Sequence, residues 1–166
     1  MSRWRIDSER TSFYVTFRPG LPGLGLRVTG VSGSFEATLD ERGQPHLEHP
    51  VEGEFQMTVD DLSLGPPVLA RAVRSFLGGD DAVAVRGWMG DVHPLGDDEY
   101  RFALRMELRG NQDCIDAVGR TALQKDGSVK VHGTSEVDPR GLGVPIPRVI
   151  PLRCRAAWDL RILPDD

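Results

Sequence analysis

The sequence lacks the features that mark two large classes of protein. No apolar run approaches the roughly 20 residues that a helix needs to span a bilayer. Acidic residues outnumber basic ones, 25 against 20, which gives a formal net charge of -5. Phosphate binding requires a basic surface, so this balance argues against a nucleic-acid partner. We therefore expect a protein with no nucleic-acid partner and no integral membrane association.

Cysteine is scarce, and the two that are present, Cys114 and Cys154, do not suit a disulfide. Cys154 falls on the apolar row of an alternating stretch, whereas Cys114 is in register with the polar residues Asp116 and Arg120. Side chains on opposite faces stay apart, so we expect free thiols, as in a reducing compartment. Residues 1–7 are charged, strand-like sequence with no secretory signal, which predicts a cytoplasmic protein, and Trp4–Asp7 is predicted as a short lead-in.

Motifs for catalysis, metal binding or cofactor binding are missing as well. His46 and His49 are three residues apart in a segment predicted to be extended, where they face opposite sides and gain no third ligand. The serines and cysteines lack the context of a nucleophile elbow or a cysteine protease. The glycine-rich residues 21–26 lack the Lys-Ser/Thr pair of a phosphate-binding loop. We therefore predict no metal, no cofactor and no enzymatic activity.

What the sequence has in quantity is alternation of apolar and polar residues. The stretch Tyr100–Arg109 places apolar residues at every second position, with charged residues between them except at Ala103, and Leu152–Ile162 repeats the pattern. Period two predicts strands with one dry face and one wet face. Each stretch would reach roughly 30 Å at about 3.3 Å per residue. Long one-sided strands of this kind favour curling around a shared apolar interior.

Shorter alternating runs, separated by turn residues, predict the other strands. Asp126-Gly127 is a strong hairpin signal, and Gly30 and Gly33 suggest a bend or bulge of the kind that a closing sheet needs. An eight-stranded barrel has an interior just large enough for side chains or one small ligand. We therefore predict an all-β fold, an antiparallel lipocalin-like barrel of about eight strands that takes up residues 1–166 as a single domain. The predicted strands span residues 13–17, 27–40, 46–60, 83–89, 100–109, 115–123, 129–137 and 152–162.

One amphipathic helix is predicted between residues 69 and 77. Its apolar residues recur at positions i, i+3, i+4, i+7 and i+8, Pro66 and Pro67 suit its first turn, and Gly78 suits its C-terminal cap. Such a helix is either a plug packed over one end of the sheet or a lid that moves to admit a ligand. The residues that would cover the mouth of the barrel are Leu69, Val73 and Phe76.

The apolar rows are the positive signal for function. They are rich in phenylalanine and methionine, whereas the facing row Ala117, Gly119 and Thr121 is small. Large residues facing small ones either interdigitate as a packed core or leave a tunnel, and a methionine lining suits an adaptable apolar ligand. The predicted ligand-binding residues are Phe13, Val15, Phe55, Met57, Met89, Tyr100, Phe102, Leu104, Met106, Ile115, Val131, Cys154 and Trp158.

Several short motifs, in order along the chain, resemble those of the YceI-like family. They are Trp4-Arg5-Ile6-Asp7 with Thr11-Ser12-Phe13, Gly33-Ser34-Phe35, Met106-Glu107-Leu108-Arg109-Gly110, Ser135–Gly143 and Pro151–Ile162. The resemblance implies a bacterial protein with an extended lipocalin-like barrel that holds a polyisoprenoid or another long amphiphile.

The chain also departs from the family's pattern. The family often has a histidine just before its first serine, where this sequence has Arg10-Thr11-Ser12. The polar loop after the family's third strand is replaced by Leu64-Gly65-Pro66-Pro67 and the predicted helix.

Three interpretations of function follow. The first is non-catalytic binding or carriage of a long-chain lipid or isoprenoid inside the barrel, with a homodimer left open. The second is a barrel filled by its own side chains, which acts through its surface as a protein-interaction module and has no cavity. The third is an enzyme on an apolar substrate, which would need a polar group in the interior. Thr121 and Ser135 are the nearest inward candidates by parity.

Overall fold

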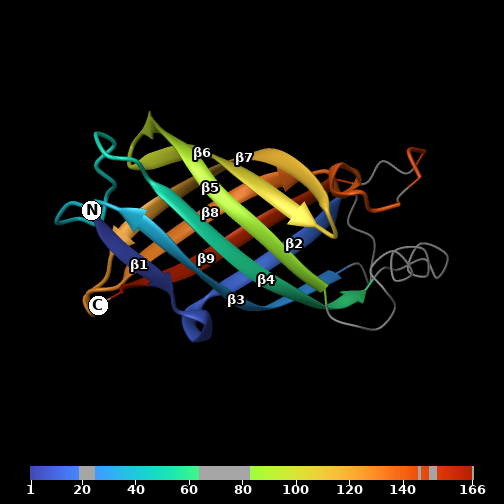
Figure 1. The fold of residues 1–166 in the computed structure, drawn as a ribbon, viewed down its shortest axis with the longest axis horizontal. Coiled ribbons are helices and arrows are strands. Elements are labelled where there is room, and N and C mark those ends of the chain that lie inside the picture. Colours follow the sequence, from blue (N-terminus) through green and yellow to red (C-terminus); the bar gives the residue numbers. More distant parts are fainter. Residues whose placement is uncertain (19–24, 64–82, 146, 150–152, 166) are drawn as a thin grey trace.

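The alternating stretches form strands in the computed structural model, which describes residues 1–18, 25–63, 83–145, 147–149 and 153–165. All of the strands belong to one antiparallel sheet (Figure 1). They are β1 (Ser2–Ile6), β2 (Ser12–Arg18), β3 (Gly25–Ala37), β4 (Glu52–Ser63), β5 (Val83–Gly96), β6 (Glu99–Leu108), β7 (Asn111–Leu123), β8 (Val129–Val137) and β9 (Arg153–Pro164).

The sheet closes on itself because β1 and β2 share one position in it. Both lie between β3 and β9, with Trp4 of β1 opposite Phe35 and Val15 of β2 opposite Leu26. A single 3-10 turn, η1 (Ser8–Arg10), separates the two strands. The nine strands therefore fill eight positions, and the predicted eight-stranded antiparallel barrel is confirmed. The lead-in predicted over Trp4–Asp7 overlaps the second half of β1.

Bulges bend the long strands around the barrel. The β3–β4 register shifts between Thr29 and Ser32, where Gly30 has a φ of 58° that L side chains rarely adopt. A second shift falls between Gly90 and His93 of β5. The bend predicted from Gly30 is thus present, and it lets 12- and 13-residue strands follow the curvature that closure requires.

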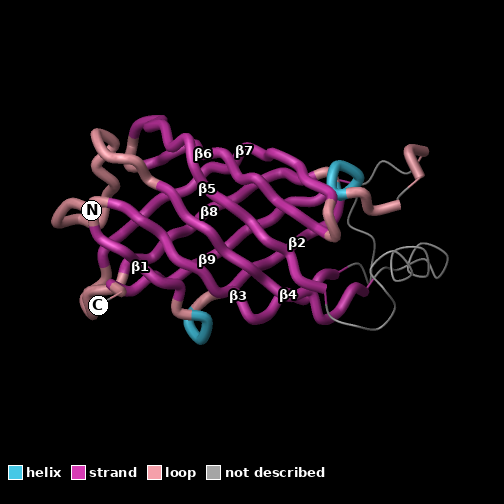
Figure 2. Tube along the Cα trace, viewed as in Figure 1, coloured by secondary structure: helices cyan, strands magenta, loops and turns pink. Residues whose placement is uncertain are grey.

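Helical structure is minor in the part of the chain that is described. It consists of η1 and a second 3-10 turn, η2 (Pro139–Leu142), which packs against β6 and β7 (Figure 2). Within the same residues, no helix is long and apolar enough to cross a membrane. The helix predicted between residues 69 and 77 lies outside the described residues.

A charged network ties η1 to the β7–β8 hairpin. Arg10 bonds Asp7 and Asp126, with each N–O distance 2.6 Å. The hydroxyl of Ser128, which is fully buried, donates to the Asp126 carboxylate and accepts from Arg161. The Ser128 hydrogen bond, followed by the Arg10 guanidinium, holds the pKa of Asp126 well below its usual range. The network therefore fixes the turn where β1 passes into β2.

Acid should weaken this network. Because the pKa of Asp126 is lowered in the folded protein, its stabilisation is complete above the unfolded pKa of about 4 and is lost as the pH falls towards the folded pKa. We expect Asp126→Asn to lower the melting temperature by a few degrees at pH 7, and this difference to narrow steadily below about pH 4. Thermal unfolding followed by circular dichroism measures it, and a difference that is independent of pH would contradict the assignment.

Candidate functional site

The inward rows of the barrel enclose an apolar cavity of about 250 Å³. It extends from Leu39 and Pro45, at the end that carries both chain termini, to Leu142 and Val144 beside η2 (Figure 1). No charged side chain is present among the described residues that line it. For comparison, an engineered apolar cavity of about 150 Å³ stays dry and binds benzene. Side chains therefore leave part of the barrel interior empty.

Alternation along the strands places the lining side chains. In β6, Phe102, Leu104 and Met106 are buried, while Arg101, just before them, and Arg105, between Leu104 and Met106, are exposed. All of the predicted ligand-binding residues lie on the cavity wall, although their contact with a ligand stays a prediction. They are Phe13, Val15, Phe55, Met57, Met89, Tyr100, Phe102, Leu104, Met106, Ile115, Val131, Cys154 and Trp158.

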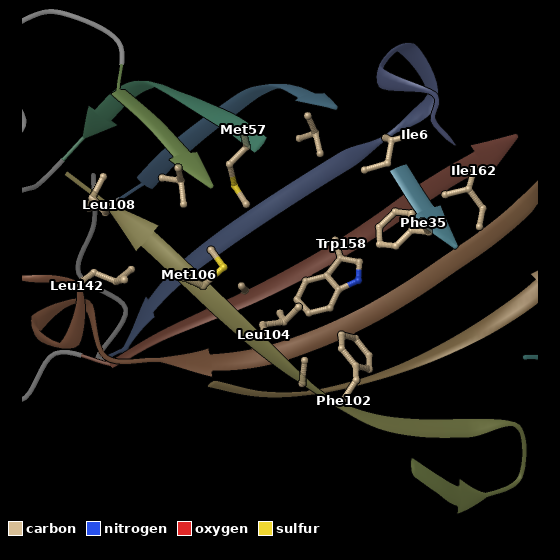
Figure 3. Packing of buried hydrophobic residues seen from close by; sticks show 14 of the residues in the cluster. Ile6, Phe35, Met57, Phe102, Leu104, Met106, Leu108, Leu142, Trp158 and Ile162 are labelled. Atoms are coloured by element: carbon tan, nitrogen blue, oxygen red, sulfur yellow. The ribbon is translucent and has the colours of Figure 1, made fainter. Parts of the chain in front are cut away.

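Trp158 is the centre of an aromatic group on the wall. Phe13, its direct neighbour across the β2–β9 pairing, stacks on it with ring centroids 5.8 Å apart and an interplanar angle of 11°. Phe102 meets it edge-on at 6.2 Å and 64°. Figure 3 shows Trp158, Phe102, Leu104 and Met106 converging on the interior from β9 and β6. Aromatic contacts of this kind hold the rings in defined positions.

A hydrogen-bonded group around Gln44 closes the end of the cavity near the chain termini. The side-chain amide of Gln44 donates to the Thr121 carbonyl at 2.8 Å. The hydroxyls of Tyr100 and Thr121 donate to its Oε1 at 3.0 and 3.3 Å. Gly43 is buried against the backbone of Leu123, where an added Cβ would collide, and the Leu123 N–H donates to the Arg42 carbonyl. This loop therefore crosses the barrel end in backbone contact with β7.

Burial raises the pKa of the Tyr100 hydroxyl, and the nearby carboxylates of Asp98 and Asp40 raise it further. Tyr100 therefore stays protonated and keeps its hydrogen bond to Gln44. The pKa of Asp40 is lowered, because its carboxylate accepts hydrogen bonds from the backbone N–H groups of Gln44 and Arg42. No sequence pattern marks this group, since Gln44 lies in a segment predicted only as a turn.

The inward polar residues that the enzyme interpretation requires are present but occupied. Thr121 donates to the Gln44 amide oxygen, and Ser135 donates to the Asp116 carbonyl at 2.8 Å. Within the described part of the chain, neither hydroxyl is hydrogen-bonded to a base that could activate it. His46 and His49 are both exposed, and no three metal-ligating side chains come together among the described residues.

The two thiols face opposite sides of the barrel wall, as predicted, and both are free. Cys154 is buried on the cavity wall, and burial raises the pKa of its thiol to about 12. Cys114 is exposed on the outer face of β7. The predicted lid residues Leu69, Val73 and Phe76 lie outside the described residues.

Only one thiol should react readily in the folded protein. At pH 8, a thiol of pKa about 12 is a thiolate in about one molecule in ten thousand, and the thiolate is the reactive form. We expect a small thiol reagent to modify Cys114 quickly and Cys154 only after denaturation, as counted by intact mass. Cys114→Ser should abolish the fast reaction. Rapid labelling of that variant would show that the interior is open to water.

No protein-family model and no curated protein sequence matches this chain. Its fold, however, is shared with solved structures. The crystal structure of Burkholderia cenocepacia BcnA is 13% identical, with a TM-score of 0.57 over 95% of this chain and 99% of that one. A polyisoprenoid binding domain from Saccharophagus degradans, implicated in plant cell wall breakdown, is 12% identical, with a TM-score of 0.57 over 99% and 100%.

A mutant CJ YCEI protein aligns over 88% of this chain and 87% of its own, with 7% identity and a TM-score of 0.52. Identities this low establish a common fold alone. The barrel implied by the resemblance to the YceI-like family is thereby confirmed: this chain folds as the YceI structures do.

Proposed function

We propose that this protein binds a long-chain apolar or amphiphilic ligand, such as a polyisoprenoid or another lipid, inside the barrel without catalysing a reaction. The observation that carries the proposal is an open cavity of about 250 Å³ lined by apolar side chains, with no charge among the described lining residues. A hydrocarbon chain requires no more than such a wall, because burying each methylene contributes about 0.8 kcal/mol.

The methionines of the wall suit ligands of different shapes. Met57, Met89 and Met106 come from three neighbouring strands, and an unbranched thioether side chain can take several rotamers without leaving the cavity. The cavity already has room for more than a benzene-sized group. Rotation of these side chains would give a longer chain the additional room that it needs.

The polar end of an amphiphile belongs at the η2 end of the barrel. At the opposite end, Gln44 is hydrogen-bonded to Tyr100 and Thr121 and closes the interior. A charged group placed in the cavity would lose its hydration without gaining a partner on the described wall. The ligand therefore lies with its tail towards Gln44.

The shared fold supports this proposal over its alternatives. The structure from Saccharophagus degradans is described as a polyisoprenoid binding domain, and the same type of barrel here surrounds an apolar space. A barrel filled by its own side chains predicts no cavity. An enzyme would need a polar group free to act, whereas Thr121 and Ser135 are engaged in hydrogen bonds.

Affinity should rise with chain length until the cavity is full. For straight-chain alcohols, each added methylene should tighten the dissociation constant by roughly fourfold, since about 0.8 kcal/mol is gained per group. Displacement of retinol, followed by its fluorescence, measures the series, and native mass spectrometry with isoprenoid alcohols tests the isoprenoid class directly. A protein that takes up neither retinol nor any alcohol would overturn the proposal.

A substitution that fills the cavity should weaken ligand binding without lowering the stability of the protein. Ala156 is buried on the wall, whereas Ala157 beside it faces outwards. We expect Ala156→Leu to weaken retinol uptake by about tenfold or more and to leave the melting temperature unchanged or higher, because its methyl groups enter empty space. Ala157→Leu, the matched control, should leave uptake unchanged. In a filled barrel, Ala156→Leu would instead overpack the core and destabilise it by about 1–3 kcal/mol.

A further inference from the structure

At three glycines on the inner wall, the ring of the aromatic residue directly opposite on the neighbouring strand takes up the side-chain space. Each pair is in cross-strand register, and the aromatic member lines the cavity. Glycine inside a strand weakens it and typically marks a place where another group approaches closely. The pairs are Phe35 with Gly53, Phe55 with Gly87, and Trp158 with Gly133.

Each ring occupies the space where the glycine would otherwise carry a side chain. A Cβ added to Gly87 would come within 3 Å of three ring atoms of Phe55, and the other two glycines show the same collision with their partners' rings. The ring therefore leans sideways over the neighbouring strand and lies against the wall. A ring held upright by a bulkier neighbour would extend towards the barrel axis.

Around Trp158 the arrangement includes a second glycine. Gly133 is followed across the sheet by Gly119, so the indole faces a stretch of wall with two successive glycines. Phe13 of the other neighbouring strand, β2, stacks on the indole. Phe102 lies close to Gly119, with a ring carbon 3.2 Å from an added Cβ. The rings of Trp158 and Phe102 thus lie over glycines of the wall. Without these glycines, the rings would extend further into the interior.

We propose that these glycine–aromatic pairs determine the width of the cavity and therefore which apolar chains it admits. This inference rests on the proposed function and adds the residues that set its selectivity. Flat rings offer an extended chain a smooth aromatic surface and leave the axis free, whereas a single methyl group on the wall would raise a ring into the path of the ligand.

The β5 strand provides a matched test. Gly87→Ala should raise Phe55 into the cavity and weaken retinol binding by about tenfold or more, because the space of several methylenes is lost. Gly90→Ala, three residues along the same strand, is the control: an added Cβ there meets nothing within 4 Å, so binding should be unchanged. Circular dichroism checks that both variants are folded.

A second variant removes the ring that causes the conflict. Gly87→Ala combined with Phe55→Leu should fold and should bind retinol at least about threefold more tightly than Gly87→Ala alone. A folded Gly87→Ala protein that binds as tightly as the wild type overturns the inference, and so does a double variant that fails to fold or to bind. Failure of the wild type to bind retinol or any alcohol rejects the proposed function itself, so the two outcomes are distinguishable.

Discussion

Closure of the sheet is the constraint on which the rest of the structure depends. A strand needs a hydrogen-bonded neighbour on both sides, and only a closed barrel provides one for every strand. Here closure requires the first strand position to be divided, with β1 pairing at one end of β3 and β9 and β2 pairing further along the same two strands. The turn between them is anchored by Arg10 to Asp126 of the distant β7–β8 hairpin. Once the sheet is closed, every second side chain points into a common interior.

Closure also separates polar from apolar chemistry. Inward positions in the middle of the strands receive no water and few partners, so a polar group there must find its hydrogen bonds on the wall. Ser135 bonds the carbonyl of Asp116 in the neighbouring strand. Tyr100 and Thr121 lie near the end of the barrel, where Gln44 reaches them from a loop. The interior between these points is left to aliphatic, aromatic and sulfur-containing side chains, which is the environment that a hydrocarbon chain requires.

The strands and the inward or outward direction of their side chains could be predicted from the sequence, because the alternation along a strand depends only on neighbouring residues. The alternation from Tyr100 to Leu108 correctly assigns each of those side chains to the inside or the outside. The role of Gln44 could not be predicted, because its partners Tyr100 and Thr121 are more than fifty residues away and no local pattern marks a loop that crosses a barrel end. The pairing of Phe55 with Gly87 was hidden for a related reason: it depends on the register between strands, which alternation leaves undetermined.

An empty interior lowers the stability of the folded protein, and a bound ligand can restore it. Cavities in protein cores destabilise by about 24 cal/mol per Å³, so an empty space of about 250 Å³ forfeits on the order of 6 kcal/mol of packing. That is comparable with the whole stability of a typical domain, about 5–15 kcal/mol. The chain could reduce this loss with a larger residue at Ala156, which lines the space, yet a small residue stands at this inward position. A ligand that occupies the space restores the missing contacts and stabilises the folded state by mass action, so occupancy and stability are coupled in this fold.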